Sequence, residues 1–204
     1  MLRRTTAALL AASLSLALVA CGGKPSTSPG TSDKTDAAPT QDAQQQLTAK
    51  LNAYIGCFNA VDSEVHGSAR AYTGWIKDLE AGPSGRETRV YGPSEIDDYD
   101  MKQCDAPITE AIAAQPALPE LDAAAGRYLQ ALKALVPVSH EAHDYYERQD
   151  YEDDQFAKGK QLHAPLMAAF KAFAGASETF NVELERQNDA AQREHLKALE
   201  QAEG

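Results

Sequence analysis

Residues 47–79 read LTAKLNAYIGCFNAVDSEVHGSARAYTGWIKDL, and this stretch decides the fold class. Its apolar side chains recur at steps of three and four residues, the spacing that places them on one face of an α-helix. The positions are Leu47, Leu51, Tyr54, Ile55, Phe58, Val61, Val65, Ala69, Tyr72, Trp75, Ile76 and Leu79. The pattern predicts one long amphipathic helix, which Gly82-Pro83 would end.

Two further stretches carry the same helical spacing. Pro119-Glu120 opens the first, because proline suits the first turn of a helix, where its missing N–H is not needed. Its apolar face consists of Leu121, Ala125, Tyr128, Leu132 and Leu135 and continues through Ala142 and Tyr146, past a kink expected at Pro137. The last helix is expected to begin near Asp153, with a seam of Phe156, Gly159, His163, Leu166, Phe170, Phe173, Ser177, Phe180 and Leu184.

Shorter segments connect these helices. Glycine, proline and acidic residues between positions 81 and 105 predict a long loop, and a short helix is expected from about Ala106 to Ala114. Beyond Leu184 the apolar pattern thins, which predicts a helical but poorly anchored tail. The predicted fold class is all-α, an antiparallel helical bundle of three long helices plus a short one.

The N-terminus has the proportions of a bacterial secretion signal. Arg3 and Arg4 form a basic start, and the apolar stretch that follows, residues 6–20, is too short to favour a membrane span. Leu18-Val19-Ala20-Cys21 resembles the lipobox of bacterial lipoproteins, in which the cysteine receives diacylglycerol and becomes the new N-terminus. We therefore predict a signal peptide at 1–20 and lipidation of Cys21. The alternative is an ordinary signal peptide whose cysteine lies near the cut by coincidence.

Residues 22–46 contain no bulky apolar side chain, so we predict a disordered tether between Cys21 and a helical domain at 47–204. Glycine rather than aspartate follows the cysteine, a pattern that directs lipoproteins of Gram-negative bacteria to the outer membrane. The predicted location is therefore the bacterial envelope, at the outer membrane and facing the periplasm. The lipid bilayer is the predicted partner, through acylated Cys21.

The charge balance disfavours one class of partner. The chain has 19 basic and 30 acidic residues, and cleavage before Cys21 would remove only Arg3 and Arg4 from the charged set, leaving 17 against 30. A net charge near −13 repels phosphate backbones, and the basic residues are scattered, so no nucleic-acid partner is predicted.

Cys57 and Cys104 remain as a pair once Cys21 is lipidated, and exported proteins fold under oxidising conditions. A disulfide between them is predicted, and two separate buried thiols are the alternative. The disulfide would tie the far end of the long loop back to the first helix. In the chain-entropy model it would contribute about 4 kcal/mol.

Several segments of the chain resemble the YiiG-type family of bacterial lipoproteins, a domain of unknown function. They are LNAYIGCFN at 51–59, LDAAA at 121–125 with Tyr128, and DDQFAKGK at 153–160 followed by Leu162-His163. The resemblance implies a lipid anchor and a helical fold and implies no reaction. Members of this family extend further at the C-terminus than this chain does.

One dense cluster of metal-ligand side chains lies at the end of the helix that is predicted to begin at Pro119. His140, His143, Asp144 and Glu147 share one helical face, so they could offer imidazole and carboxylate groups to a divalent metal. The spacing between Glu141 and His143 does not match the His-Glu-x-x-His pattern of zinc proteases. The alternative interpretation is a solvated helix end.

His163 lies on the apolar seam, where a hydrogen-bonded core histidine is the commoner outcome. Its expected partners are Tyr128 or Asp122, and a place among the metal ligands with His140, His143 and Asp144 is the alternative. Tyr145, Tyr146 and Tyr151 are expected either to pack the bundle or to form an aromatic patch for cationic groups.

Two interpretations of function follow. The leading one is a non-enzymatic envelope lipoprotein whose helical bundle binds an unknown protein or small-molecule partner, without a cofactor. The alternative is a periplasmic bundle that holds a metal or cofactor through His140, His143, Asp144 and His163. A hydrolase without a recognisable motif is a third, weaker interpretation, and no catalytic residue is predicted.

Overall fold

The computed structural model describes residues 41–203, and the regular structure of this part is entirely helical. The signal peptide, Cys21 and most of the predicted tether lie outside the described residues. The helices are α1 (Gln41–Thr73), α2 (Asp98–Ala113), α3 (Pro119–Glu147), the single turn α4 (Tyr151–Asp154) and α5 (Ala157–Glu203). None of the helices in residues 41–203 has the length and apolar character needed to cross a membrane.

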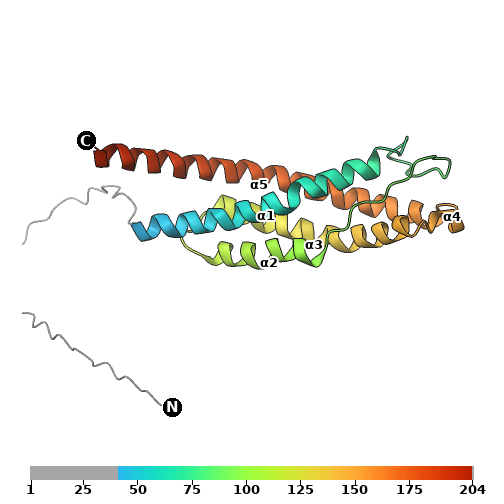
Figure 1. Cartoon of the computed structure of the whole chain (residues 1–204), viewed down its shortest axis with the longest axis horizontal. Helices are drawn as coiled ribbons and strands as arrows, with labels where there is room; N and C mark the ends of the chain where they lie inside the picture. Colours follow the sequence, from blue (N-terminus) through green and yellow to red (C-terminus); the bar gives the residue numbers. More distant parts are fainter. Residues whose placement is uncertain (1–40, 204) are drawn as a thin grey trace, which may run out of the picture. The chain divides into compact units, whose positions relative to one another are not determined.

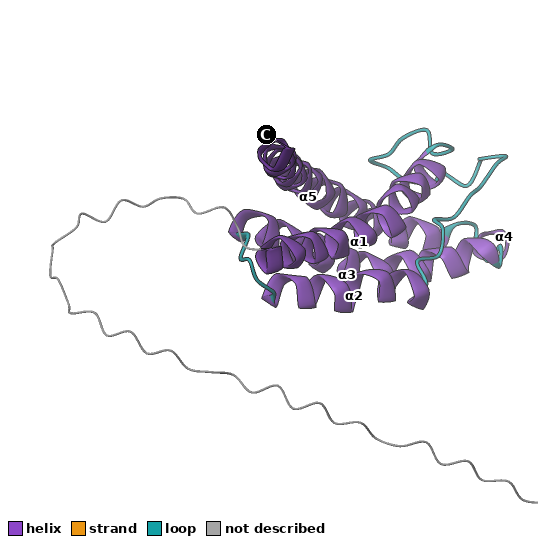
Figure 2. Cartoon of the chain, turned by 60° about the vertical axis from the view of Figure 1, so that its left-hand side comes forward, coloured by secondary structure: helices purple, strands orange, loops and turns teal. Residues whose placement is uncertain are grey.

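Four of these helices form an antiparallel bundle, as predicted. Helix α1 packs against α2 and α5, and α3 packs against the same two helices, so each helix contacts two neighbours. Figure 1 shows the chain alternating in direction from α1 to α2, α3 and α5, with α4 making the tight turn between the last two. Figure 2 shows that the long loop after α1 lies at the same end of the bundle as α4.

The predicted apolar seams form the core of this bundle. From α1, the side chains of Leu51, Tyr54, Val61 and Val65 are buried as expected, and α3 contributes Leu121, Tyr128, Leu132 and Leu135. The seam of α5 is buried from Leu162 to Leu184. Tyr128 lies between Phe173 and Phe180, with ring centroids 5.0 Å away in both cases. Burial of these large side chains is the main source of stability.

Helix α1 begins and ends earlier than the predicted 47–79. Residues 41–46, which were assigned to the tether, are helical because glutamine and alanine extend an anchored helix at little cost. At the other end the chain leaves the helix after Thr73 and folds back, so the side chain of Ile76 is buried outside any helix. The apolar spacing at Trp75 and Ile76 therefore reflects tertiary packing of a loop and not a helical face.

Helix α2 is longer than the predicted 106–114, because the acidic run that was assigned to the loop starts it. The Asp97 side chain accepts hydrogen bonds from the amides of Tyr99 and Asp100 at 2.7 and 3.0 Å. In return the Asp100 carboxylate accepts from the Asp97 amide at 3.1 Å. This reciprocal capping satisfies amides that the first turn of a helix leaves unpaired.

The start of the last helix also differs from the prediction at Asp153. Tyr151–Asp154 form α4, and Gln155 and Phe156 then adopt φ angles of 55° and 64° before α5 begins at Ala157. The Phe156 ring remains in the core and stacks on Tyr151 at 4.9 Å, so packing compensates for an unfavourable backbone conformation. The predicted helical tail is confirmed, since α5 continues beyond Leu184 with mostly exposed side chains. Helix α3 runs through Pro137.

The predicted disulfide is confirmed. Cys57 in α1 and Cys104 in α2 are bonded, and both residues are fully buried. Since α2 begins at Asp98, the bond joins two helices directly and closes the connection at the base of the long loop, rather than ending within the loop itself.

We expect the free energy of unfolding to fall steeply above pH 10. Burial raises the pKa of Tyr54, Tyr128, Tyr145 and Tyr146 above that of a free tyrosine, and it raises the pKa of Tyr72 to about 12. Unfolded tyrosines lose their protons near pH 10, so between pH 10 and 12 the unfolded chain binds fewer protons and is favoured. Tyr72 alone would account for a loss of about 2–3 kcal/mol by pH 12.

Urea denaturation at pH 8, 10 and 11.5, with absorbance at 295 nm recording tyrosinate, measures this effect. In the folded chain these five tyrosines should stay protonated near pH 10 and should ionise only when the chain unfolds. Their ionisation near pH 10 with the helical circular dichroism intact would contradict the prediction.

Candidate functional site

The residues predicted as metal ligands do not form a metal site. Within residues 41–203 no group of three or more His, Cys, Asp or Glu side chains is arranged to hold a metal ion. Asp144 pairs with Arg148 at 3.3 Å, and His140 faces Glu95 at 3.6 Å, both on the protein surface. The pattern of imidazoles and carboxylates on one helical face is present, but Asp144 and His140 lie against other charged side chains.

His163 is a hydrogen-bonded core histidine. Its Nδ1 lies 2.9 Å from the Tyr72 hydroxyl and its Nε2 lies 2.8 Å from the Leu79 carbonyl oxygen. Because a carbonyl only accepts, this geometry places the ring proton on Nε2 and leaves Nδ1 to accept from Tyr72. The partner is therefore Tyr72, and the expectation of Tyr128 or Asp122 was wrong.

Two of the predicted metal ligands instead fasten the long loop, residues 74–97, to the bundle. His163 holds the first part of the loop through Leu79, and His143 Nδ1 lies 3.0 Å from the Pro93 carbonyl oxygen in its second part. The Ser94 amide also donates to the Ser68 hydroxyl at 2.8 Å. Each contact uses a backbone group of the loop, so the loop has a defined conformation and is held at both ends.

The loop also lies unusually close to the helices. A Cβ atom at Gly82, which has a φ of 79°, would come within 2.9 Å of the His163 ring. At Gly92 a Cβ would lie 2.6 Å from the Cβ of Tyr146. Only glycine permits such an approach without displacing the partner, so these two residues let the loop dock on α3 and α5.

The tyrosines considered as a cation-binding patch are packing residues. Tyr145 and Tyr146 are buried, and their rings pack edge to face at 4.9 Å. The Trp75 ring, which comes from the loop, lies 5.9 Å from that of Tyr146 and 6.3 Å from that of Phe156. These rings form an aromatic cluster in which Trp75 of the loop packs against the helices.

A cavity of about 640 Å³ lies between the end of α1 and the loop, where Trp75 and Tyr91 line it. The Trp75 indole N–H donates to the Tyr91 carbonyl at 2.8 Å, which joins the two ends of the loop across the cavity. Its basic lining residues are Arg70, Lys77, Arg86 and Arg89. We call the cavity formed by these six residues the cationic pocket.

The charge of the cationic pocket is poorly balanced by its own carboxylate. Glu87 also lines it, but one Glu87 oxygen accepts from the Ser84 amide and hydroxyl, both at 2.8 Å. The other accepts from the Gly85 and Arg86 amides at 2.8 and 2.9 Å. Burial alone would raise the pKa of this carboxyl, but these hydrogen bonds outweigh it and lower the pKa to about 2. Glu87 therefore stays ionised and is already engaged by the loop backbone.

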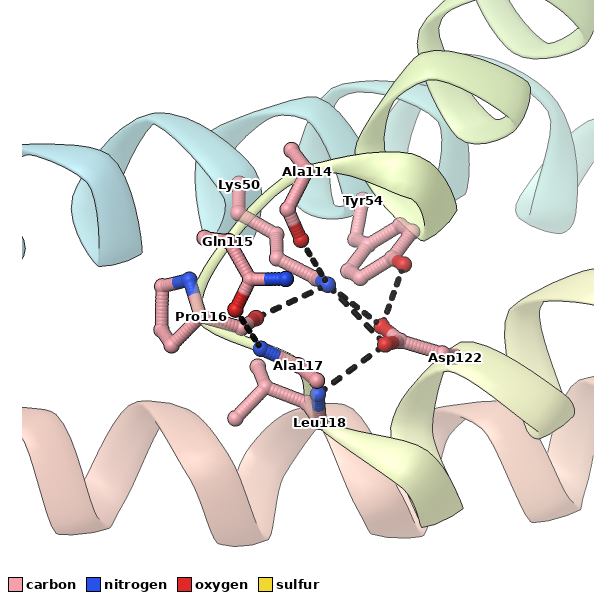
Figure 3. A network of polar contacts seen from close by, with 8 residues as sticks. All are labelled: Lys50, Tyr54, Ala114, Gln115, Pro116, Ala117, Leu118 and Asp122. Atoms are coloured by element: carbon pink, nitrogen blue, oxygen red, sulfur yellow. Dashed lines mark hydrogen bonds and ion pairs between the residues drawn. The ribbon is translucent and has the colours of Figure 1, made fainter.

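A buried ion pair at the opposite end of the bundle has a structural role. Figure 3 shows Lys50 reaching from α1 into the turn between α2 and α3, where its ammonium lies 2.9 Å from both Asp122 carboxylate oxygens. The same ammonium donates to the carbonyls of Ala114 and Pro116 at 2.9 and 3.0 Å. All three donors of the lysine are therefore used, and none is left for a ligand.

Asp122 is equally well satisfied. It accepts from the Tyr54 hydroxyl at 2.7 Å and from the Leu118 amide at 2.9 Å, as Figure 3 also shows. The network therefore clamps α1, the turn and the first residues of α3 together.

A serine, a histidine and an aspartate meet in the bundle without forming a catalytic triad. Ser177 donates to Asp62 at 2.5 Å, and His66 Nε2 lies 3.3 Å from the Ser177 hydroxyl. In a triad the histidine stands between the other two and bonds the aspartate through its second nitrogen. Here His66 presents the same Nε2 to Asp62, at 3.8 Å, and Ser177 is buried. The arrangement is a packing contact between α1 and α5.

Sequence reasoning missed the cationic pocket because it weighed charge over the whole chain. The net charge near −13 after cleavage indicates that phosphate backbones are repelled, and the basic residues are scattered along the sequence. A local signal was available, since Arg86 and Arg89 stand among glycine, proline and serine, where the chain must turn. Their meeting with Arg70 and Lys77 depends on the path of the loop and could not be read from spacing.

Comparison with known proteins agrees with the resemblance noted above. The chain is 35% identical over 171 residues to the uncharacterized protein YiiG of Escherichia coli (strain K12). The match covers 84% of this chain and 49% of the relative, so the chain spans about half the length of that protein. No solved structure matches significantly. A family described as a protein of unknown function, DUF3829, matches residues 45–203, and the chain therefore belongs to this family.

Proposed function

We propose that this chain is a lipoprotein of the bacterial envelope that binds a small molecule, without chemical conversion, in the cationic pocket. The helical domain presents this pocket at the end where α1 meets the 74–97 loop. The lipobox at residues 18–21 and the composition of residues 22–46 support a lipid anchor on a spacer. Mass spectrometry of the chain exported by its native host should find diacylglycerol on Cys21, and an unmodified thiol would contradict the anchor.

The observation that carries the proposal is a preformed cavity with convergent side chains. About 640 Å³ is in the range that holds a metabolite-sized ligand, and the aromatic rings of Trp75 and Tyr91 offer apolar contact. Because His143, His163 and Ser68 hold the loop backbone, ordering of that backbone costs little on binding.

The lining chemistry favours binding over catalysis. A general base needs a free lone pair within reach of its substrate. The Glu87 carboxylate has both oxygens engaged by amides of its own loop. The remaining charged groups in the lining are arginine and lysine, which orient ligands through hydrogen bonds.

Trp75 is the sole tryptophan of the chain, so its fluorescence reports on the pocket directly. We expect at least one compound from a panel of sugars, nucleotides, amino acids and short peptides to change the emission of the full chain saturably. Tyr91→Ala should raise the Kd of that compound about tenfold, which corresponds to about 1.4 kcal/mol of binding free energy. Tyr99→Ala is the matched control, because both tyrosines are exposed, at 59% and 68%, and Tyr99 lies outside the pocket.

Equal effects of the two substitutions would show that the compound binds elsewhere. A panel that leaves both the fluorescence and the melting temperature of the chain unchanged would contradict a small-molecule function for this cavity.

A further inference from the structure

We infer that the ligand of the cationic pocket is an oligoanion, a small molecule that carries two or more phosphate or carboxylate groups beside a ring. This inference rests on the proposed function and adds the chemical class of the ligand. The anionic character of the ligand is inferred from the charge of the lining residues, whereas the binding site itself is inferred from the cavity and the fixed loop.

The first supporting observation is that the basic side chains of the pocket lack acidic partners. None of the ion pairs in residues 41–203 includes Arg70, Lys77, Arg86 or Arg89. Elsewhere in this part of the chain, Lys158 and Arg186 pair with Glu141 and Glu183 at 3.0 and 2.7 Å. Other cations of residues 41–203 also form no ion pair, but none of them lines the cationic pocket: Lys102, Arg127, Lys160 and Lys171.

The gathering of four unpaired cations around one cavity is unexpected for the composition of the chain. Acidic residues outnumber basic ones by 30 to 19, so a cation on this surface has carboxylates in excess to pair with. Four cations nevertheless surround one cavity, with Glu87 as the acidic residue in its lining. Four positive charges against one negative charge leave a local excess of three.

The local excess decides the sign of the field in the pocket. Charges more than about 8 Å away are largely screened at physiological ionic strength, so the charged groups that line the cavity contribute most to the field inside it. Glu87 is itself partly neutralised, because three backbone amides and a hydroxyl point at its oxygens. An anion in the pocket therefore meets a positive potential on an acidic protein.

The identity of the side chains narrows the ligand further. Guanidinium groups bind phosphate and carboxylate through paired N–H donors, and three of the four cations are arginines. A cavity of about 640 Å³ is much larger than one phosphate, so several anionic groups and a further moiety fit. The rings of Trp75 and Tyr91 offer flat faces against which a sugar or a base can stack.

The test measures the binding of four probes to the full chain, which is reconstituted in phosphatidylcholine nanodiscs. Uridine diphosphate carries the ring and the charges, pyrophosphate carries the charges alone, and uridine carries the ring alone. The fourth probe replaces part of the phosphatidylcholine by phosphatidic acid, which offers the same phosphate chemistry as a lipid headgroup. Trp75 fluorescence and calorimetry measure binding.

We expect uridine diphosphate and pyrophosphate to bind at least tenfold more tightly than uridine, with affinity falling as salt is added. The double substitution Arg86→Gln and Arg89→Gln should raise the Kd of both at least tenfold. Arg193→Gln with Lys197→Gln makes the same change in net charge on α5 and should alter the Kd less than twofold. A response to phosphatidic acid alone that requires Arg86 and Arg89 would contradict the inference, because it would identify the ligand as a lipid headgroup with a single phosphate and no ring.

Two further results would overturn the inference, and they can be told apart. If uncharged compounds bind in a manner that depends on Tyr91 but not on Arg86 and Arg89, the pocket is a binding site whose ligand is not anionic. If neither the anions nor the uncharged panel changes Trp75 emission, the proposed function fails together with the inference.

Discussion

Replacing Lys50 by methionine is expected to destabilise the domain by about 3–5 kcal/mol, the range observed when one partner of a buried ion pair is removed. Lys50 is 2% exposed, and its ammonium is the partner of Asp122 and of two carbonyls in the turn before α3. Methionine fills a similar volume but donates no hydrogen bond. The substitution would therefore leave the part-buried Asp122 carboxylate without its counter-ion, and it would remove the donor that Lys50 supplies to the Ala114 and Pro116 carbonyls.

The matched control is Lys133→Met. Lys133 also pairs with an aspartate, Asp105, but the two side chains are 47% and 49% exposed. Solvent screens such pairs, and their loss costs about 0–1 kcal/mol. Urea denaturation followed by circular dichroism measures both variants under the same conditions.

The chemistry of the network allows an independent check. Asp122→Asn should lower the free energy of unfolding, as Lys50→Met does, because it removes the charge that compensates the ammonium. The double variant should lose less than the sum of the two single effects, since each single change already breaks the pair. Additive effects, or a Lys50→Met loss no larger than that of Lys133→Met, would show that the clamp in Figure 3 contributes little to stability.

Removal of the disulfide by Cys57→Ala with Cys104→Ala is expected to lower the free energy of unfolding by about 4 kcal/mol, within the usual range of 2–5. The bond closes a sequence separation of 47 residues that includes the whole 74–97 loop. Its loss restores conformational freedom to the unfolded chain. It also releases α2, which has a short buried face made of Cys104, Ile108 and Ala111.

Hydrogen exchange can distinguish this effect from a general loss of core packing. The amides of α2 should lose protection first, while those in the middle of α3 and α5 keep theirs until global unfolding. Treatment of the unsubstituted chain with a reductant should reproduce both the stability loss and the exchange pattern. Ile108→Val, which trims the same face without cutting the bond, is the control and should cost about 1 kcal/mol. Uniform loss of protection across all helices would contradict a local role for the bond.

The accuracy of prediction from sequence differed between helix interiors and helix ends. The buried positions of α3 and α5 followed the predicted stripes because helical periodicity arises from the chain's own geometry. The ends were less accurate. Trp75 and Ile76 continue the apolar spacing of α1 but belong to a loop that folds back. Asp97 lies in a stretch that predicts a loop, but its side chain caps α2.

At the candidate site the sequence indicated important residues but not their partners. His143 and His163 were singled out because of their residue type, and the structure uses both to hold the loop that forms the cationic pocket. Neither the Pro93 carbonyl nor the Leu79 carbonyl could be identified as a partner, because backbone groups carry no signal in the sequence. The pocket could not be predicted either, because its basic residues meet only when these contacts fix the path of the loop.

By itself the sequence determined that the chain is helical, which faces of its helices are buried, and that Cys57 and Cys104 are the pair available for a disulfide once Cys21 is lipidated. Each of these follows from local periodicity or from the number of available partners. Only the tertiary structure decided where residues 74–97 lie, and with them that Arg86 and Arg89 meet Arg70 and Lys77 around one cavity. The physical reason is that a loop is positioned by distant contacts, such as the close approach of Gly92 to Tyr146, whose geometry depends on the packed helices.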